Sequence, residues 1–213
     1  MNKIIFAPEQ RSAELDLAHE RKLLKDRLFI LLLGPSGVGK STIIKELNNL
    51  TGNTRFSYVK PFMTRPLRPD ETDKISISSE GFDQMKDRSE FVVVNDRYHV
   101  RYGTPLSGIL SPLSQQITPI LDYPLETVPA LQRPEYDTLN FYVYPASIEE
   151  WKQRMESSGR NMNGRLEAGL HELGRLAALG FVHPDIDLSV VNADGASSAA
   201  AHDILECIDT LVT

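Results

Sequence analysis

The sequence contains little cysteine, since Cys207 is the single one among 213 residues. One cysteine cannot form a disulfide within the chain, and this composition fits a reducing compartment. Because Cys207 lies in an apolar run near the C-terminus, we expect it to be a small core residue. The N-terminal residues MNKIIFAPEQ lack the apolar core of a secretory signal, and no stretch approaches the length of a membrane span. We therefore expect a cytoplasmic protein without a membrane partner.

The chain also lacks an excess of positive charge. The formal net charge is -6, so the chain has no broad basic field and we expect no nucleic-acid polymer as a partner. The five histidines show no metal-ligand spacing. Hydrophobic residues make up 41% of the chain and charged residues 24%, which is typical of a globular domain. An anionic ligand therefore has to be bound by a local site.

Apolar runs of strand length alternate with helical patterns along most of the chain. The run RLFILLLG at 27–34 is continuous, which is typical of a parallel strand buried on both faces. Further core strands are expected at 117–121, closed by Asp122, at 139–144, closed by Pro145, and at 186–191. Helices are expected at 41–50, 147–157, 164–179 and the C-terminus. This order predicts an α/β fold with a parallel sheet wrapped by helices.

Two parts of the chain fall outside this alternation. Residues 1–27 form an N-terminal extension, in which 12–27 is typical of a charged amphipathic helix, either solvated or packed on the body or a second copy. The middle of the chain has the composition of an insert. We expect no regular core element at 70–80, short strands at 91–94 and 98–102, and a loop or broken helix at 107–114.

The segment GPSGVGKS at 34–41 matches the phosphate-loop pattern G-x-x-x-x-G-K-[ST] in full, between a predicted strand and a predicted helix. Its glycines let successive backbone N–H groups point at phosphate oxygens, and the helix N-terminus adds partial positive charge. Lys40 is expected to reach the β- and γ-phosphates of ATP, and Ser41 to supply a hydroxyl to Mg²⁺. The residues expected to bind the nucleotide are Gly34, Ser36, Gly37, Val38, Gly39, Lys40, Ser41 and Thr42.

A second candidate anion site follows in TRPLRPDE at 64–71. Arg65 and Arg68 lie three residues apart in a stiff, proline-rich segment, a geometry suited to the clamping of a phosphate. Farther on, Tyr102 and Thr104 place two hydroxyls around a glycine. A chain with two phosphate sites favours a phosphotransferase over a simple nucleotide binder.

Five blocks in order, GPSGVGKS, TRPLRPDE, YGTP, ILD and VVNADG, resemble the guanylate kinase family over nearly the whole chain after the extension. The resemblance implies a three-layer P-loop kinase fold over 28–213, with a small insert for the nucleoside monophosphate at about 58–104 and a lid at about 155–168. It implies Mg²⁺- and ATP-dependent phosphoryl transfer to a nucleoside 5'-monophosphate or a related phosphorylated small molecule. A monomer or a homodimer is expected.

The resemblance also implies roles for individual residues. Arg65, Arg68 and Tyr102 would bind the acceptor's phosphate, with Thr104 near its base or ribose. Asp122 would help to place Mg²⁺ through water, although a strand-ending cap is the alternative reading. Arg154, Arg160 and Arg165 lie in or beside the stretch that resembles the lid, where they would neutralise charge during transfer. We take Lys40, Arg154 and Arg165 as the candidate catalytic residues.

The positions that read guanine in this family are altered. Pro61, Ile77 and Val93 stand where the family has a serine, a tyrosine and a glutamate, and Pro124 replaces a second aspartate. The polar residues that could read a base instead are Glu90, Asn95 and Asp96. The pattern predicts an acceptor other than GMP. A kinase of another phosphorylated metabolite, such as a ribose phosphate, and a non-catalytic module that binds protein partners stay open as alternatives.

Overall fold

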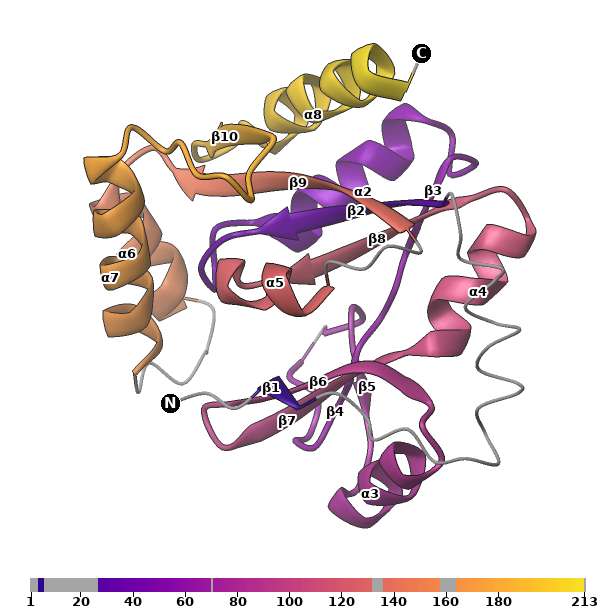
Figure 1. The fold of residues 1–213 in the computed structure, drawn as a ribbon. Helices are drawn as coiled ribbons and strands as arrows, with labels where there is room; N and C mark the ends of the chain where they lie inside the picture. Colours follow the sequence, from indigo (N-terminus) through magenta and orange to yellow (C-terminus); the bar gives the residue numbers. More distant parts are fainter. Residues whose placement is uncertain (1–3, 6–26, 70, 132–135, 158–163, 213) are drawn as a thin grey trace. The chain divides into compact units, whose positions relative to one another are not determined.

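The computed structural model describes residues 4–5, 27–69, 71–131, 136–157 and 164–212. The chain divides into two compact units. The first comprises the described parts of Met1–Phe29, Ser57–Pro119 and Pro129–Asp137, and the second comprises those of Ile30–Phe56, Ile120–Val128 and Thr138–Thr213. Each unit contains one sheet, and Figure 1 shows the course of the chain.

The second unit is built on a five-stranded sheet in the order β10-β9-β2-β8-β3. Strand β2 is parallel to β8, and β10 is parallel to β9. Five consecutive residues at the end of β2 are buried, because an apolar run without alternation suits a strand covered on both faces. The strands are β2 (Arg27–Leu33), β3 (Phe56–Tyr58), β8 (Thr118–Tyr123), β9 (Tyr136–Pro145) and β10 (Leu188–Asn192).

Helices cover this sheet. Helix α2 lies beside α8, and α8 contacts β10, whereas α6 and α7 lie next to each other (Figure 1). The buried residues Ile43, Ile44 and Leu47 give α2 one apolar face toward the core. The helices are α2 (Lys40–Leu50), η1 (Leu125–Thr127), α5 (Val128–Leu131), α6 (Ile148–Ser157), α7 (Arg165–Ala178) and α8 (Ser197–Val212).

The first unit is built on a second sheet in the order β1-β6-β7-β4-β5. Antiparallel pairing joins β1 to β6, β6 to β7 and β7 to β4. One face packs on helix α3 through a cluster that contains Phe82, Phe91 and Val94. The elements are β1 (Ile4–Ile5), β4 (Phe62–Met63), β5 (Ile75–Ser76), α3 (Ser79–Asp87), β6 (Phe91–Arg97), β7 (Val100–Pro105) and α4 (Leu106–Ser114).

The predicted fold class is confirmed: a parallel sheet is wrapped by helices, and every predicted core strand and helix of the second unit is present. Residues 12–26 of the expected helix at 12–27 lie outside the described residues, as does Arg160, whereas Arg27 begins strand β2. Within the part of the chain that is described, no helix combines the length and apolarity that crossing a membrane would require.

Three local predictions were wrong. Helix α3 and strand β5 occur in or directly after the polar segment 70–80, because the side chain of Ser78 caps the helix by accepting a hydrogen bond from Gly81 N at 3.0 Å. Residues 107–114 form the regular helix α4 in spite of Pro112, which lies near its end. Asp122 does not close its strand, since β8 continues to Tyr123.

Candidate active site

The phosphate loop connects β2 to α2 in the second unit. Gly39 takes a left-handed conformation with φ 98° just before α2, and no side chain of the described residues caps this helix N-terminus. The first turn of α2 also contains no acidic residue. The backbone N–H groups at the start of a helix have no partner within it, so an uncapped start such as this one is suited to bind an anion.

Two glycines of the loop have no room for a side chain. A Cβ atom on Gly39 would lie 2.3 Å from Nδ2 of Asn192, and one on Gly37 would lie 2.4 Å from Sδ of Met155. Both glycines also have positive φ, a conformation that other residues rarely adopt. The glycine spacing of the motif is therefore required by close packing as well as by the course of the backbone.

Buried side chains from distant parts of the sequence hold the loop in place. Nε1 of Trp151 on α6 donates a hydrogen bond to the carbonyl of Ser36 at 2.8 Å. Nδ2 of Asn192, at the end of β10, donates to the carbonyl of Val38 at 2.7 Å. Trp151 and Asn192 are 0% and 1% exposed, so these bonds are shielded from water. Such bonds fix where the loop carbonyls point, and thereby where the loop N–H groups point.

Lys40, the first residue of α2, folds back over the loop. Its Nζ donates hydrogen bonds to the carbonyls of Gly34 at 2.7 Å and Pro35 at 3.1 Å. The ammonium group is therefore held at the loop, where it can offer its charge to a bound phosphate. Ser41 and Thr42 follow on the first turn and are exposed.

Two of the predicted arginines lie at the phosphate loop. Nη1 of Arg165, which is 8% exposed, lies 3.4 Å from Oγ of Ser36. Arg154 donates from Nη2 to the carbonyl of Asn192 at 3.0 Å, and its Nε forms an ion pair with Oδ1 of Asp194 at 2.9 Å. The structure therefore places Lys40, Arg154 and Arg165 around one loop of one unit, which gives this loop a concentration of positive charge.

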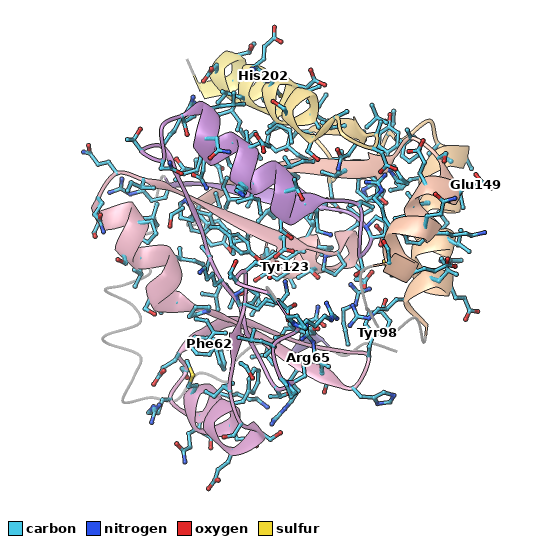
Figure 2. All side chains as sticks on the ribbon, turned by 180° about the vertical axis from the view of Figure 1, so that it is seen from behind. Phe62, Arg65, Tyr98, Tyr123, Glu149 and His202 are labelled. Atoms are coloured by element: carbon cyan, nitrogen blue, oxygen red, sulfur yellow. The ribbon has the colours of Figure 1, made fainter. Side chains whose placement is uncertain are left out.

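Asp122 lies on β8, the strand that pairs with β2, and β2 leads into the phosphate loop. Asp122 pairs in register with Leu32 on β2, two residues before Gly34, and the next residue of β8, Tyr123, is labelled in Figure 2. A carboxylate at the carboxyl end of a strand beside the phosphate-loop strand is in the part of the sheet where α/β proteins bind ligands.

The second predicted anion site lies in the first unit, where Arg65 follows β4 (Figure 2). Its Nη1 and Nη2 donate to the two carboxylate oxygens of Glu71 at 2.7 and 2.6 Å. Nη1 of Arg68 lies 3.6 Å from the same carboxylate, and the backbone N–H of Arg68 donates to it at 3.0 Å. Both predicted arginines thus form ion pairs with the same carboxylate, that of Glu71.

The ion pair between Arg65 and Glu71 is shielded, with side-chain exposures of 17% and 9%. Burial alone would raise the pKa of Glu71, but hydrogen bonds from Arg65 and the backbone of Arg68 outweigh it and lower the pKa to about 2. The hydrogen bond to Glu71 raises the pKa of Arg65, with a further contribution from Tyr102. The carboxylate is therefore ionised at neutral pH and holds the guanidinium in a fixed orientation.

Strand register places the remaining predicted acceptor residues on one face of the first sheet. Tyr102 pairs with Asn95 on one side and with Met63 on the other, and Thr104 pairs with Val93. Directly paired residues share a face, and so do residues two apart on a strand. Tyr102 also interacts with Arg65, so this face is continuous with the arginine site.

Three positions depart from the guanine-reading pattern: Pro61, Ile77 and Val93. All three side chains are apolar. Val93 is 2% exposed. Ile77 packs against the cluster beneath α3, and the carbonyl of Pro61 accepts a hydrogen bond from the backbone of Ile75 at 3.0 Å. No carboxylate replaces the missing glutamate at these three positions.

Comparison with known proteins shows which family the chain belongs to. Residues 25–194 match the family model described as guanylate kinase. The chain belongs to the guanylate kinase family. It is 31% identical over 176 residues to the guanylate kinase of Symbiobacterium thermophilum, with 81% of each chain covered. It is 30% identical over 147 residues to that of Clostridioides difficile, which covers 68% of this chain and 71% of the relative.

A solved guanylate kinase from Anaplasma phagocytophilum superposes with a TM-score of 0.62 at 16% identity, covering 87% of this chain and 86% of that one. This likeness shows the fold alone. Membership of the guanylate kinase family confirms the predicted family, fold class and enzyme class, so the chain is a nucleoside monophosphate kinase.

Several residues that build these sites were not assigned a role from the sequence. Glu71 and Asn192 lie inside the quoted blocks TRPLRPDE and VVNADG, so the motifs contained them without showing what they contact. Trp151 and Met155 lie on α6, where their helical spacing is that of ordinary core residues. Their contacts with the phosphate loop, which the sequence does not show, distinguish them from other core residues.

Proposed function

We propose that this protein transfers the γ-phosphoryl group of ATP to the 5'-phosphate of a nucleoside monophosphate, with the two phosphate sites just described as its donor and acceptor sites. The uncapped, glycine-shaped start of α2 would hold the phosphates of ATP. Arg65, Arg68 and Tyr102 would hold the phosphate of the acceptor, with Thr104 near its base or ribose. The observation that carries this proposal is the pair of fixed cationic sites, one built on backbone N–H groups and one on guanidinium groups.

Catalysis would depend on charge and position. In phosphoryl transfer negative charge spreads over the oxygens of the moving group, and fixed cations in a site that excludes water stabilise it. Lys40, Arg154 and Arg165 supply such charges at the donor loop. The hydrogen bonds that Lys40 donates to the loop carbonyls and Arg154 donates to the carbonyl of Asn192 orient both side chains before the nucleotide binds.

Mg²⁺ fits the oxygen donors at this loop. The hydroxyl of Ser41 is exposed at the start of α2, and the carboxylate of Asp122 lies on the neighbouring strand. Among the described residues, no group of three or more His, Cys, Asp or Glu side chains could hold a metal ion. This agrees with an ion that keeps several waters and takes its other ligands from the phosphates of the nucleotide. When bound, Mg²⁺ would neutralise phosphate charge.

The wider organisation belongs to the same proposal. We take 1–27 as an N-terminal extension, about 58–104 as the acceptor-binding insert and about 155–168 as a lid, of which 158–163 lie outside the described residues. The protein would act in the cytoplasm, as a monomer or homodimer, on small phosphorylated substrates.

An assay of ADP release with a panel of ribo- and deoxyribonucleoside monophosphates tests the proposal. At least one monophosphate should be phosphorylated, and Arg65→Ala should raise its KM by about a hundredfold while leaving the KM for ATP nearly unchanged. Arg88→Ala is the matched control, since Arg88 forms an exposed pair with Glu90 at 2.5 Å. Silence with every monophosphate, or a change of the ATP KM alone in the Arg65 variant, would refute the assignment.

A further inference from the structure

One atom of the buried Asn95 side chain, the amide oxygen Oδ1, has no hydrogen-bond partner among the residues that the structure describes. Asn95 lies in the middle of β6 and is 7% exposed. A buried polar atom without a partner costs free energy, and most such atoms in native proteins have one. The atom is an acceptor, so the group that would satisfy it is a hydrogen-bond donor.

Asn95 lies on the sheet face that carries the proposed acceptor site. It pairs directly with Tyr102, and neighbouring strands are about 4.8 Å apart. Tyr102 in turn interacts with Arg65. A ligand whose phosphate is bound by Arg65 and Tyr102 would therefore have the remainder of its structure close to Asn95.

The other polar residues that could read a base are less suited. Glu90 is bound to Arg88, with an exposed carboxylate. Asp96 is exposed and pairs with Arg101, whose guanidinium lies over the ring of Phe82 at 4.8 Å. Asp96 is thus on the face of the sheet that packs on α3, opposite to Tyr102. Of the three candidates, Asn95 alone is buried on the acceptor face.

Asn95 is accompanied by Val93, two residues earlier on the same face. An asparagine side chain offers a carbonyl oxygen as acceptor and an NH2 group as donor, which match the amino group and a ring nitrogen of adenine. Beside that ring nitrogen adenine has a C–H group, which an aliphatic side chain can cover without loss. Guanine has an amino group at this position, and burial against a valine would leave that group without a partner.

We propose that Asn95 reads the base of the acceptor nucleotide and, together with Val93, selects an adenine-type edge over a guanine edge. This inference rests on the proposed function, because it assumes that Arg65 and Tyr102 bind the acceptor's phosphate. It assigns the specificity of the site to two neighbouring positions of β6.

The test compares kcat/KM for AMP, IMP, GMP, CMP, UMP and ribose 5-phosphate in the wild type and two variants. The wild type should prefer AMP to GMP by about tenfold or more. Asn95→Asp places a carboxylate where guanine offers two N–H donors, so it should shift the AMP-to-GMP ratio toward GMP by about tenfold or more. Asn95→Ala should lower kcat/KM for AMP by about tenfold and leave ribose 5-phosphate unchanged. The control, Asp96→Ala, should leave all ratios as they are.

Each alternative outcome has a distinct meaning. A wild type that prefers GMP, or an Asn95→Asp variant with an unchanged AMP-to-GMP ratio, overturns the inference while the proposed function stands. The same holds if Asn95→Ala lowers activity on every acceptor equally, as a purely structural role would. If Asn95→Ala does not fold, the isosteric Asn95→Asp decides alone. If no monophosphate is phosphorylated, the proposed function fails. Calorimetry of AMP and GMP binding to the wild type and to Asn95→Asp then tests the inference, with the ratio of the two affinities in place of the ratio of kcat/KM values.

Discussion

The two phosphate sites of this protein differ in what holds them. The loop before α2 would bind phosphate through backbone groups, and its shape depends on buried side chains more than a hundred residues away in the sequence, Trp151 and Asn192. The arginine site would bind phosphate through side chains, and an acid six residues away from Arg65 orients it. The first site is therefore a property of the whole fold of its unit, whereas the second can be changed by a few substitutions on one sheet. With the proposed roles of the two sites, this difference predicts that substitutions can alter acceptor choice more readily than ATP use.

The largest effect is expected at the loop itself. Lys40→Ala removes the charge that the loop carbonyls hold in place, so kcat should fall about a thousandfold or more while the fold is kept. Steady-state kinetics and circular dichroism would measure both. Lys45→Ala, on the same helix but at an exposed position, should behave as the wild type. An Lys40→Ala variant within tenfold of the wild-type rate would contradict the role of this residue.

A smaller effect is expected where the fold supports the loop. Asn192→Ala deletes the hydrogen bond to the carbonyl of Val38 and leaves a buried carbonyl unpaired, which should cost about 1–3 kcal/mol of stability. It should also raise the KM for ATP about tenfold and leave the acceptor KM unchanged, as measured by denaturant unfolding and kinetics.

The matched control for this variant lies on the same strand. Ser189 of β10 donates a hydrogen bond to the carbonyl of Phe181 at 2.6 Å, away from the loop. Ser189→Ala should reduce stability without changing the KM for ATP. If both variants changed the KM for ATP equally, the hydrogen bond from Asn192 would have no specific effect on ATP binding. The proposed difference between the loop and the arginine site would then be wrong.

The smallest effect is a pH dependence at the arginine site. The pKa of Glu71 is about 2 in the folded protein, below its ordinary value of 4.5, so its ionised form contributes stability above about pH 4.5. That contribution is lost as the pH falls from 4.5 through 2. Glu71→Gln should therefore be less stable than the wild type by about 1–3 kcal/mol at neutral pH, and the gap should close in acid.

Urea unfolding between neutral pH and about pH 3 would measure this gap. Glu90→Gln, which alters an exposed pair with Arg88, should show little difference from the wild type at any pH. A gap for Glu71→Gln that stays constant with pH would mean that folding does not lower the pKa of Glu71.

The fold of the second unit and the donor loop could be predicted from the sequence because their signals are local. A continuous apolar run such as Phe29 to Leu33 leaves few alternatives to a buried parallel strand. Two glycines, a lysine and a serine at fixed spacing have one common structural use between a strand and a helix. Each signal lies within a few residues, so no knowledge of distant contacts was needed.

The features that were missed depend on contacts between distant or weakly patterned residues. Helix α3 begins with polar residues, and only the cap by Ser78 and the burial of Phe82 against the sheet make it stable. The orientation of Asn95 toward the face of Tyr102 depends on a register shift between Phe91 and Val93, and a shift of one residue reverses which side chains face the site. From the sequence, Asn95 and Asp96 were both candidates for reading the base. The strand register places only Asn95 of these two on the face of Tyr102.

The contact between α6 and the phosphate loop has one more consequence. Trp151 is the protein's lone tryptophan, and its indole N–H is bound to the carbonyl of Ser36. All indole emission of the chain therefore originates at the wall of the donor loop. Any rearrangement of the loop around a triphosphate would alter the surroundings of this one fluorophore, so the unlabelled protein carries its own optical reporter of nucleotide binding.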